Sequence, residues 1–260
     1  MKNEILIPTE WNDVTLEEFI NLSALDISKF ENPIEYYIHM LRIFGNDNID
    51  EIFEYVKTVD LANIVEQMSF VNTPPQKLDI KEVKIDGTLF KLTENMNELT
   101  VGEYVTIESI IERDKLDTVS AIPAILSVVL RPIDEVFDSN LCDSRMKLFK
   151  ENLSIEETLG MSGFFFDWRS VIMYNFSALF KGVEKEDDDV TVGAGAPVFS
   201  DRWKWFSIIE RLANSDITKF EEVYKQSYIS ALNLLSYWKE KDDYQKRLEK
   251  RQAMMSKHSR

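Results

Sequence analysis

Apolar residues recur every three or four positions through most of the chain, which is the spacing of one face of an α-helix. One such stripe consists of Ile34, Tyr37, Ile38, Leu41 and Phe44. Asn32 and Pro33 precede this stripe, and Gly45 follows it. Asparagine is a good helix cap, proline suits the first turn, and glycine suits the residue after the last turn, so this pattern predicts a complete helix.

Four further helix starts carry a hydroxyl residue followed three positions later by glutamate. The four pairs are Thr15 and Glu18, Thr100 and Glu103, Ser154 and Glu157, and Thr218 and Glu221. In a capping box the hydroxyl accepts from the third helical amide, and the glutamate accepts from the amide of the cap residue. The last start precedes an apolar stripe from Phe220 to Trp238 and helix-forming residues as far as Arg251. It therefore predicts a long helix of roughly 50 Å with a polar final third.

The segment 80–92 has a different pattern. Two short β-type runs, 81–85 and 88–92, flank Asp86 and Gly87. Asp-Gly readily adopts the two positive φ angles of a type I′ turn, so we expect a hairpin whose apolar face is covered by a helix. The predicted fold class is mainly α, with a multi-helix body, one inserted β-hairpin at about 80–92, and a C-terminal helical module that ends in a long helix.

A charged and glycine-rich stretch separates the two predicted helical parts. Residues 184–189 are all charged, and residues 193–197 read Gly-Ala-Gly-Ala-Pro. Neither run can bury apolar area or hold a regular element. We therefore predict a helical body with the hairpin insertion at 1–182, an acidic and Gly/Ala-rich linker at 183–199, and a C-terminal helical module at 200–260.

Two segments are strongly apolar, and the second of them resembles a membrane span only superficially. Residues 119–130 contain Pro123, which is expected to start or kink a helix, and Arg131-Pro132 ends the segment. Residues 164–180 contain Asp167, Arg169 and Asn175 in a span barely long enough to cross a bilayer. We expect a buried core helix in the second segment and no association with a membrane.

The charge of the chain is divided unevenly. Residues 1–199 carry 17 Lys and Arg against 37 Asp and Glu, whereas residues 200–260 carry 13 against 9. The positive excess lies after Trp238 and is interleaved with acidic residues. An acidic body repels nucleic acid, so this division argues against nucleic-acid binding and is also explained by solubility alone.

Few residues are suited to catalysis or metal binding. The chain has one cysteine, Cys142, and two histidines, His39 and His258. One thiol and two distant imidazoles do not match a zinc site or a Ser-His-Asp triad, and no glycine-rich phosphate-binding motif is present. His39 lies among apolar residues and is expected to be structural. A lone cysteine also fits a reducing compartment. We therefore predict a non-enzymatic protein without a cofactor or metal.

The C-terminal module is the candidate binding region. Tryptophan and tyrosine anchor many protein interfaces, and an exposed basic helix end can dock on an acidic or helical protein. The candidate partner-binding residues are Trp203, Trp205, Tyr237, Trp238, Tyr244, Arg247, Lys250 and Arg251. Two alternatives remain open: the aromatic residues belong to the core, and the basic residues form an ordinary helix terminus in which cations favour the dipole.

The order of several short patches resembles a family of small proteins of tailed bacteriophages, especially phages of Bacteroidetes. The patches are Trp11 to Phe19, the Asp-Gly hairpin, Leu99 to Tyr104, and Phe164 to Phe166. Members of that family are regarded as tail assembly chaperones or accessory morphogenesis factors. The resemblance covers the layout of the chain but carries over no catalytic or binding motif, and the linker and C-terminal module match it less well.

The resemblance implies a tail assembly chaperone that binds a tape-measure-like helical partner. The alternative is a virion structural component of the neck, tail or capsid interior. The expected partner is a phage tail or other virion protein, a homo-oligomer is compatible with either role, and the expected location is the host cytoplasm during infection or the virion.

Overall fold

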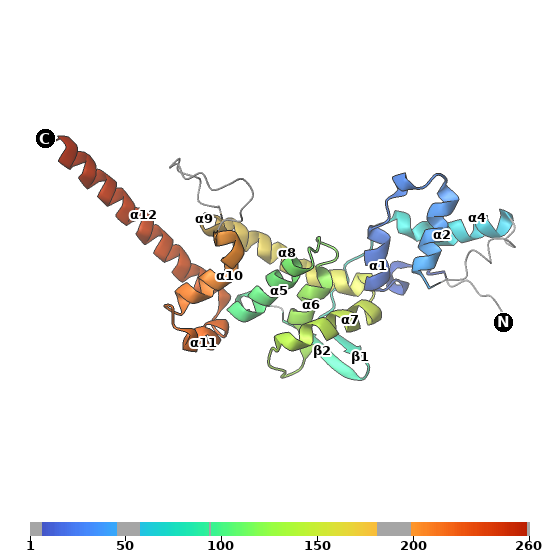
Figure 1. Cartoon of the computed structure of the whole chain (residues 1–260). Coiled ribbons are helices and arrows are strands. Elements are labelled where there is room, and N and C mark those ends of the chain that lie inside the picture. The colour runs from blue at the N-terminus through green and yellow to red at the C-terminus, as the bar shows by residue number, and fades with distance from the viewer. Residues whose placement is uncertain (1–6, 46–57, 94, 181–198, 259–260) are drawn as a thin grey trace. The chain divides into compact units, whose positions relative to one another are not determined.

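The structure is a computed structural model that describes residues 7–45, 58–93, 95–180 and 199–258. It confirms a mainly α fold with a small antiparallel sheet and a long C-terminal helix (Figure 1). The strands are β1 (Glu82–Ile85), β2 (Thr88–Leu92) and β3 (Leu130–Pro132). The α-helices are α1 (Leu16–Ser23), α2 (Pro33–Ile43), α4 (Thr58–Gln67), α5 (Val101–Arg113), α6 (Ile122–Val129), α7 (Cys142–Asn152), α8 (Ile155–Asn175), α9 (Ser177–Phe180), α10 (Phe199–Leu212), α11 (Phe220–Tyr224) and α12 (Tyr228–His258).

The contacts divide the chain into two compact units. Unit one comprises residues 1–94 and 109–165, and unit two comprises residues 95–108 and 166–260. Helices α5 and α8 therefore each contribute one part to either unit. Residues 183–198 of the predicted linker lie outside the described residues, and the predicted domain boundaries stay a prediction.

Three of the four predicted capping boxes are formed. The Thr15 hydroxyl accepts from the Glu18 amide at 3.2 Å, and Glu18 accepts from the Thr15 amide at 2.7 Å. Thr100 with Glu103 repeats these two bonds, and Ser154 with Glu157 forms them at 3.3 and 2.9 Å.

The capping box predicted at Thr218 is wrong. Asp216 accepts from both the amide and the hydroxyl of Thr218, so the hydroxyl is used in a local turn and does not cap a helix. A short 3-10 turn and α11 follow. The long helix therefore begins at Tyr228 and not at Thr218.

In unit one, the starts of α1 and α8 are joined to each other. The first helical amide of α1, on Leu16, donates to the carbonyl of Leu153 at 2.8 Å, and that of α8, on Ile155, donates to the carbonyl of Val14 at 2.9 Å. The first amides of a helix have no partner within the helix. Each helix start thus satisfies the other, in a pairing that we call a clasp.

Unit two contains a second clasp, between the starts of α5 and α12. Val101 donates to the carbonyl of Gln226 at 2.8 Å, and Tyr228 donates to the carbonyl of Leu99 at 2.9 Å. The residues around Thr100 also repeat those around Thr15: Asn97-Glu98-Leu99-Thr100-Val101 corresponds to Asn12-Asp13-Val14-Thr15-Leu16. Both units are therefore built on the same local motif.

The hairpin forms as expected and gains a third strand. Asp86 and Gly87 have φ angles of +49° and +82°, as a type I′ turn requires. Val83 pairs with Phe90, whose ring packs edge-on against Phe149 of α7 with centroids 5.3 Å apart. The covering helix is therefore α7. The third strand, β3, directly follows α6 and pairs with β2; the residue pattern did not predict it.

The apolar segments are core helices for the most part. Every residue of α6 is buried, and Pro123 lies in its first turn as predicted. In α8, Phe165 is fully buried, but Tyr174 is 81% exposed. The prediction of a buried core helix over 164–180 placed Tyr174 in the core, and for this residue it is wrong, because α8 buries only one of its faces at that end.

An aromatic cluster forms the centre of unit two. The rings of Tyr104 and Tyr228 stack with centroids 3.9 Å apart, and Trp168 and Trp205 pack against both rings. Beside them, Arg169 binds Glu108 through two hydrogen bonds, of 2.8 and 3.2 Å. Burial raises the pKa of both tyrosines, and the carboxylate of Glu108 raises that of Tyr104 further.

Substitution of Gly160 is expected to destabilise unit one. A Cβ at Gly160 would lie 1.7 Å from the carbonyl oxygen of Leu78, which is backbone and cannot swing away. We expect Gly160→Ala to lower the free energy of unfolding by about 3 kcal/mol, measured by urea denaturation.

Gly163→Ala is the matched control for this prediction. A Cβ at Gly163 would meet only the flexible end of Lys77, at 3.2 Å. Because alanine favours a helix over glycine, its stability is expected to stay within about 1 kcal/mol of wild type. Equal effects of the two substitutions would contradict this packing.

The buried tyrosines predict a loss of stability at alkaline pH. An unfolded tyrosine loses its proton near pH 10, whereas Tyr104 and Tyr228 keep theirs to higher pH in the folded state. Unfolding therefore becomes more favourable as the pH rises above about 10, by up to about 1.4 kcal/mol per pH unit for each such tyrosine. We expect Tyr104→Phe to reduce this pH dependence, and Tyr244→Phe, at an exposed position, to leave it unchanged. Denaturation at a series of pH values measures the difference.

Candidate protein-binding surface on the C-terminal helix

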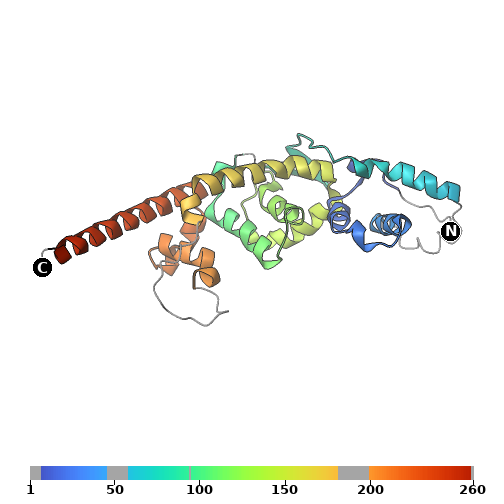
Figure 2. The same cartoon turned by 90° about the horizontal axis from the view of Figure 1, so that it is seen from above.

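Helix α12 is held at its start by the rest of unit two and continues beyond those contacts. It has 31 residues, which corresponds to about 47 Å. Its first residue, Tyr228, belongs to both the clasp and the aromatic cluster. From there α12 extends well beyond α10 and α11, the helices beside it in the chain (Figure 2).

One face of α12 packs on unit two. Tyr228, Ala231 and Leu232 are buried on this face, and Trp238 is half-buried. Arg211 of α10 lies 5.1 Å from the ring of Trp238, and its Nη2 donates to Asp242 at 2.9 Å. Every described residue of α12 beyond Lys239 whose side chain is placed is exposed, so the packed face ends near Asp242.

A second set of residues lies on the other side of the helix. At 100° per residue, its mean direction is about 150° from the packed face. The set repeats with alternating steps of three and four, which is the heptad spacing of a coiled-coil seam. We call it the outer stripe; it consists of Leu234, Tyr237, Lys241, Tyr244, Leu248, Arg251 and Met255.

The outer stripe is open to solvent along its whole length. Tyr237, Tyr244 and Met255 are 57–60% exposed, and Leu234 and Leu248 are about 40% exposed. Contiguous exposed apolar residues on a regular helix mark an interaction surface, whereas singly scattered ones do not. The outer stripe is therefore our candidate functional site.

The structure separates the predicted partner-binding residues into several groups. Tyr237, Tyr244 and Arg251 lie on the outer stripe, and Arg247 and Lys250 are exposed on the same part of α12. Trp238 lies on the packed face beneath Arg211. Trp205 packs on Tyr104 and Tyr228 in the core of unit two. Trp203 is part of α10, and its side chain lies outside the described residues.

Leu234, Lys241, Leu248 and Met255 belong to the surface but are absent from the sequence-based set. The heptad spacing from Leu234 to Met255 was the signal that could have revealed them. The predicted apolar stripe ended at Trp238 and corresponds to the packed face. The outer stripe on the opposite side of the helix was not part of that prediction.

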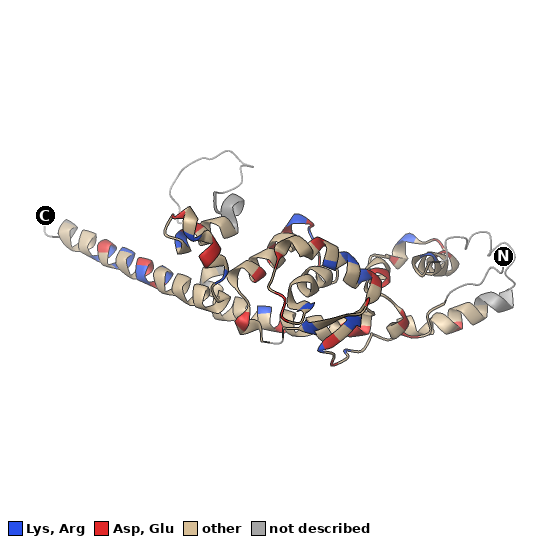
Figure 3. Cartoon of the chain, turned by 90° about the horizontal axis from the view of Figure 1, so that it is seen from below, with Lys and Arg blue, Asp and Glu red and all other residues tan. Residues whose placement is uncertain are grey.

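The charge on this part of α12 is mixed, with a basic excess toward the end (Figure 3). Between residues 245 and 256 the basic residues Lys246, Arg247, Lys250 and Arg251 outnumber the single acid, Glu249. Acidic residues predominate in the remainder of the chain. The surface therefore combines apolar anchors with positive charge.

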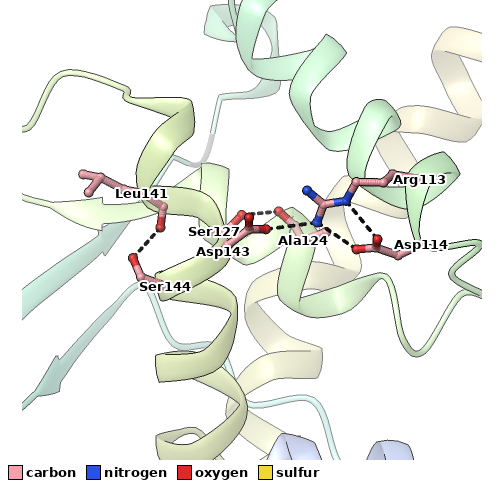
Figure 4. Close-up of polar contacts among 7 residues, drawn as sticks. All are labelled: Arg113, Asp114, Ala124, Ser127, Leu141, Asp143 and Ser144. Carbon is pink, nitrogen blue, oxygen red and sulfur yellow. Dashed lines mark hydrogen bonds and ion pairs between the residues drawn. The ribbon is translucent and has the colours of Figure 1, made fainter.

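Three residues of unit one that could carry chemistry, Arg113, Cys142 and His39, are buried or contact neighbouring side chains. The Arg113 guanidinium donates to Asp114 at 2.8 Å and to Asp143 at 3.0 Å, and so links the end of α5 to the start of α7 (Figure 4). The hydrogen bond from the Arg113 guanidinium lowers the pKa of Asp114. Cys142 is buried, and burial raises the pKa of its thiol, which disfavours the reactive thiolate. His39 packs against Phe30, with ring centroids 5.0 Å apart.

The described residues contain neither a metal-binding cluster nor a membrane-crossing helix. No group of three or more His, Cys, Asp or Glu in ranges 7–45, 58–93, 95–180 and 199–258 is placed to hold a metal ion. Within the same ranges, no helix combines the length and apolar character that crossing a membrane requires. Comparison of the chain with protein-family models, curated proteins and solved structures yields no match.

Arg211 is expected to hold α12 against unit two beyond Leu235. Replacing it by alanine removes the ion pair with Asp242 and the contact with the Trp238 ring. Because the pair is about half exposed, we expect a loss of about 1 kcal/mol in local stability. The loss should appear as faster hydrogen exchange of the backbone amides at 235–242. The control Lys246→Ala, at an exposed position, should leave the exchange of these amides unchanged.

Proposed function

We propose that this protein is a non-enzymatic morphogenesis factor of a tailed phage, of the tail assembly chaperone kind, and that it binds a helical partner through the outer stripe of α12. The observation that carries the proposal is the exposed heptad pattern on a helix that unit two anchors at one end only. The phage assignment rests on the resemblance of the short patches named above.

The proposed mechanism is temporary cover of an apolar helix. A partner with its own heptad stripe would lay it along the outer stripe, so that both apolar surfaces leave water together. Lys241 and Arg251 interrupt the apolar pattern and favour a partner with acidic residues at the facing positions. The acidic remainder of the chain would keep the complex dispersed while a tail tube assembles around the partner.

The test is capture of a partner from cells in which the phage is assembling. A tagged chain with an intact outer stripe is expected to retain a long helical phage protein, identified by mass spectrometry. The triple variant Tyr237→Ala, Tyr244→Ala and Leu248→Ala should lose it, because the anchors contribute most of the binding energy. All three side chains are exposed, so the variant should keep its fold, as circular dichroism can verify.

Two outcomes would contradict the proposal. Equal capture by the triple variant would mean that another surface binds the partner. Stoichiometric copies of the chain in finished particles would favour the alternative, a structural component of the virion neck, tail or capsid interior, over a chaperone that leaves before completion. A matched control, Asp243→Ala with Lys246→Ala, changes exposed residues of α12 outside the outer stripe and should capture the partner normally.

A further inference from the structure

We infer that the outer stripe of α12 pairs with the outer stripe of a second copy of this chain, in an antiparallel two-stranded coiled coil, whenever no partner helix is bound. The inference deepens the proposed function, on which it rests for the identity of the competing partner. Its physical basis is the set of exposed apolar and aromatic residues on the outer stripe, because exposed apolar surface favours self-association in water.

Parallel pairing is disfavoured by the residues of the seam. In the heptad abcdefg, Leu234, Lys241, Leu248 and Met255 take position a, and Tyr237, Tyr244 and Arg251 take position d. In a parallel pair each of these residues meets its own copy. Lys241 would then face Lys241, and Arg251 would face Arg251, so two layers of the seam would repel.

Antiparallel pairing removes both repulsions. In this arrangement an a residue of one helix faces a d residue of the other. One register places Leu248 opposite Tyr237 of the second copy and Lys241 opposite Tyr244 of the second copy, and symmetry repeats each layer. The first layer is fully apolar, and in the second the stem of Lys241 can lie on a tyrosine ring with its ammonium in water.

The flanking charges select this register. Glu240 and Arg247 both occupy position g, beside the seam. In the register above, Glu240 of each helix faces Arg247 of the other, which gives two pairs of opposite charge. A shift by one heptad in either direction brings Glu240 against Glu240 or Arg247 against Arg247. Flanking charges of this kind set the orientation of coiled coils.

The same residues keep the pairing weak. Lys241 lies in the middle of the seam and Arg251 near its end, where polar residues specify register at a cost in stability. A second copy therefore covers the apolar stripe but can be displaced by a helix that offers acids to these cations. Self-pairing would thus regulate access to the partner-binding surface.

Sedimentation of the purified full-length chain tests the inference. The wild type is expected to form a concentration-dependent dimer. Glu240→Arg alone and Arg247→Glu alone each turn two attractive pairs into repulsive ones and should weaken dimerisation about tenfold. The double variant Glu240→Arg with Arg247→Glu exchanges the charges and should restore dimerisation to within about threefold of wild type.

The matched control is Lys246→Glu. Lys246 is adjacent to Arg247 but lies on the side of the helix away from the seam, so the same change of charge there should leave the dimer intact. A chain that stays monomeric, or a double variant as weak as the single ones, overturns the inference. A monomeric chain that still captures a helical partner overturns self-pairing alone, whereas a dimer that captures none overturns the proposed function alone.

Discussion

The two units depend on the reciprocal hydrogen bonding of helix starts. A helix leaves its first amides without internal partners, and burying such a donor unpaired costs about 1–3 kcal/mol. In each clasp, the first amide of one helix donates to the carbonyl of the residue that lies two positions before the start of the other helix, and the reverse bond is also formed. The residues that donate and accept are almost fully buried except Gln226, which is exposed; Val14, Leu16 and Leu153 are at 0% exposure. The clasp is therefore what allows two helix ends to meet inside the core.

The clasp of unit two also determines how α12 is held. Tyr228 donates its amide hydrogen to Leu99 in this clasp, and its ring stacks on Tyr104. At the equivalent place in unit one stands Ile155, which brings no ring. The start of α12 is thus fixed by hydrogen bonds and aromatic packing together, and Arg211 extends the contact to Asp242. An arm anchored so firmly at one end can present an ordered stripe without support along its far part.

Local signals were predictable from the sequence, and pairings between distant segments were not. Three capping boxes and one turn depend only on residues within a few positions of each other, so the local sequence was sufficient to predict them. They are the boxes at Thr15, Thr100 and Ser154 and the Asp86-Gly87 turn. Strand β3 and both clasps join segments far apart in the chain, and no local pattern reports such a partner. At Thr218 two local motifs competed, and the turn closed by Asp216 prevailed. The outer stripe has a heptad spacing that is visible in the sequence, but its residues are not those of the predicted apolar stripe, which ended at Trp238.

The composition of the outer stripe explains why a folded chain can carry it at all. A seam of leucine throughout would bind strongly and unselectively, and would drive aggregation. Here tyrosine takes two of the three d positions, and cations take one a and one d position. Tyrosine keeps a polar tip in water while its ring remains available for packing, and the cations favour a partner with facing acids over one that lacks them. The stripe therefore trades affinity for selectivity, which would suit the proposed binding and later release of a partner.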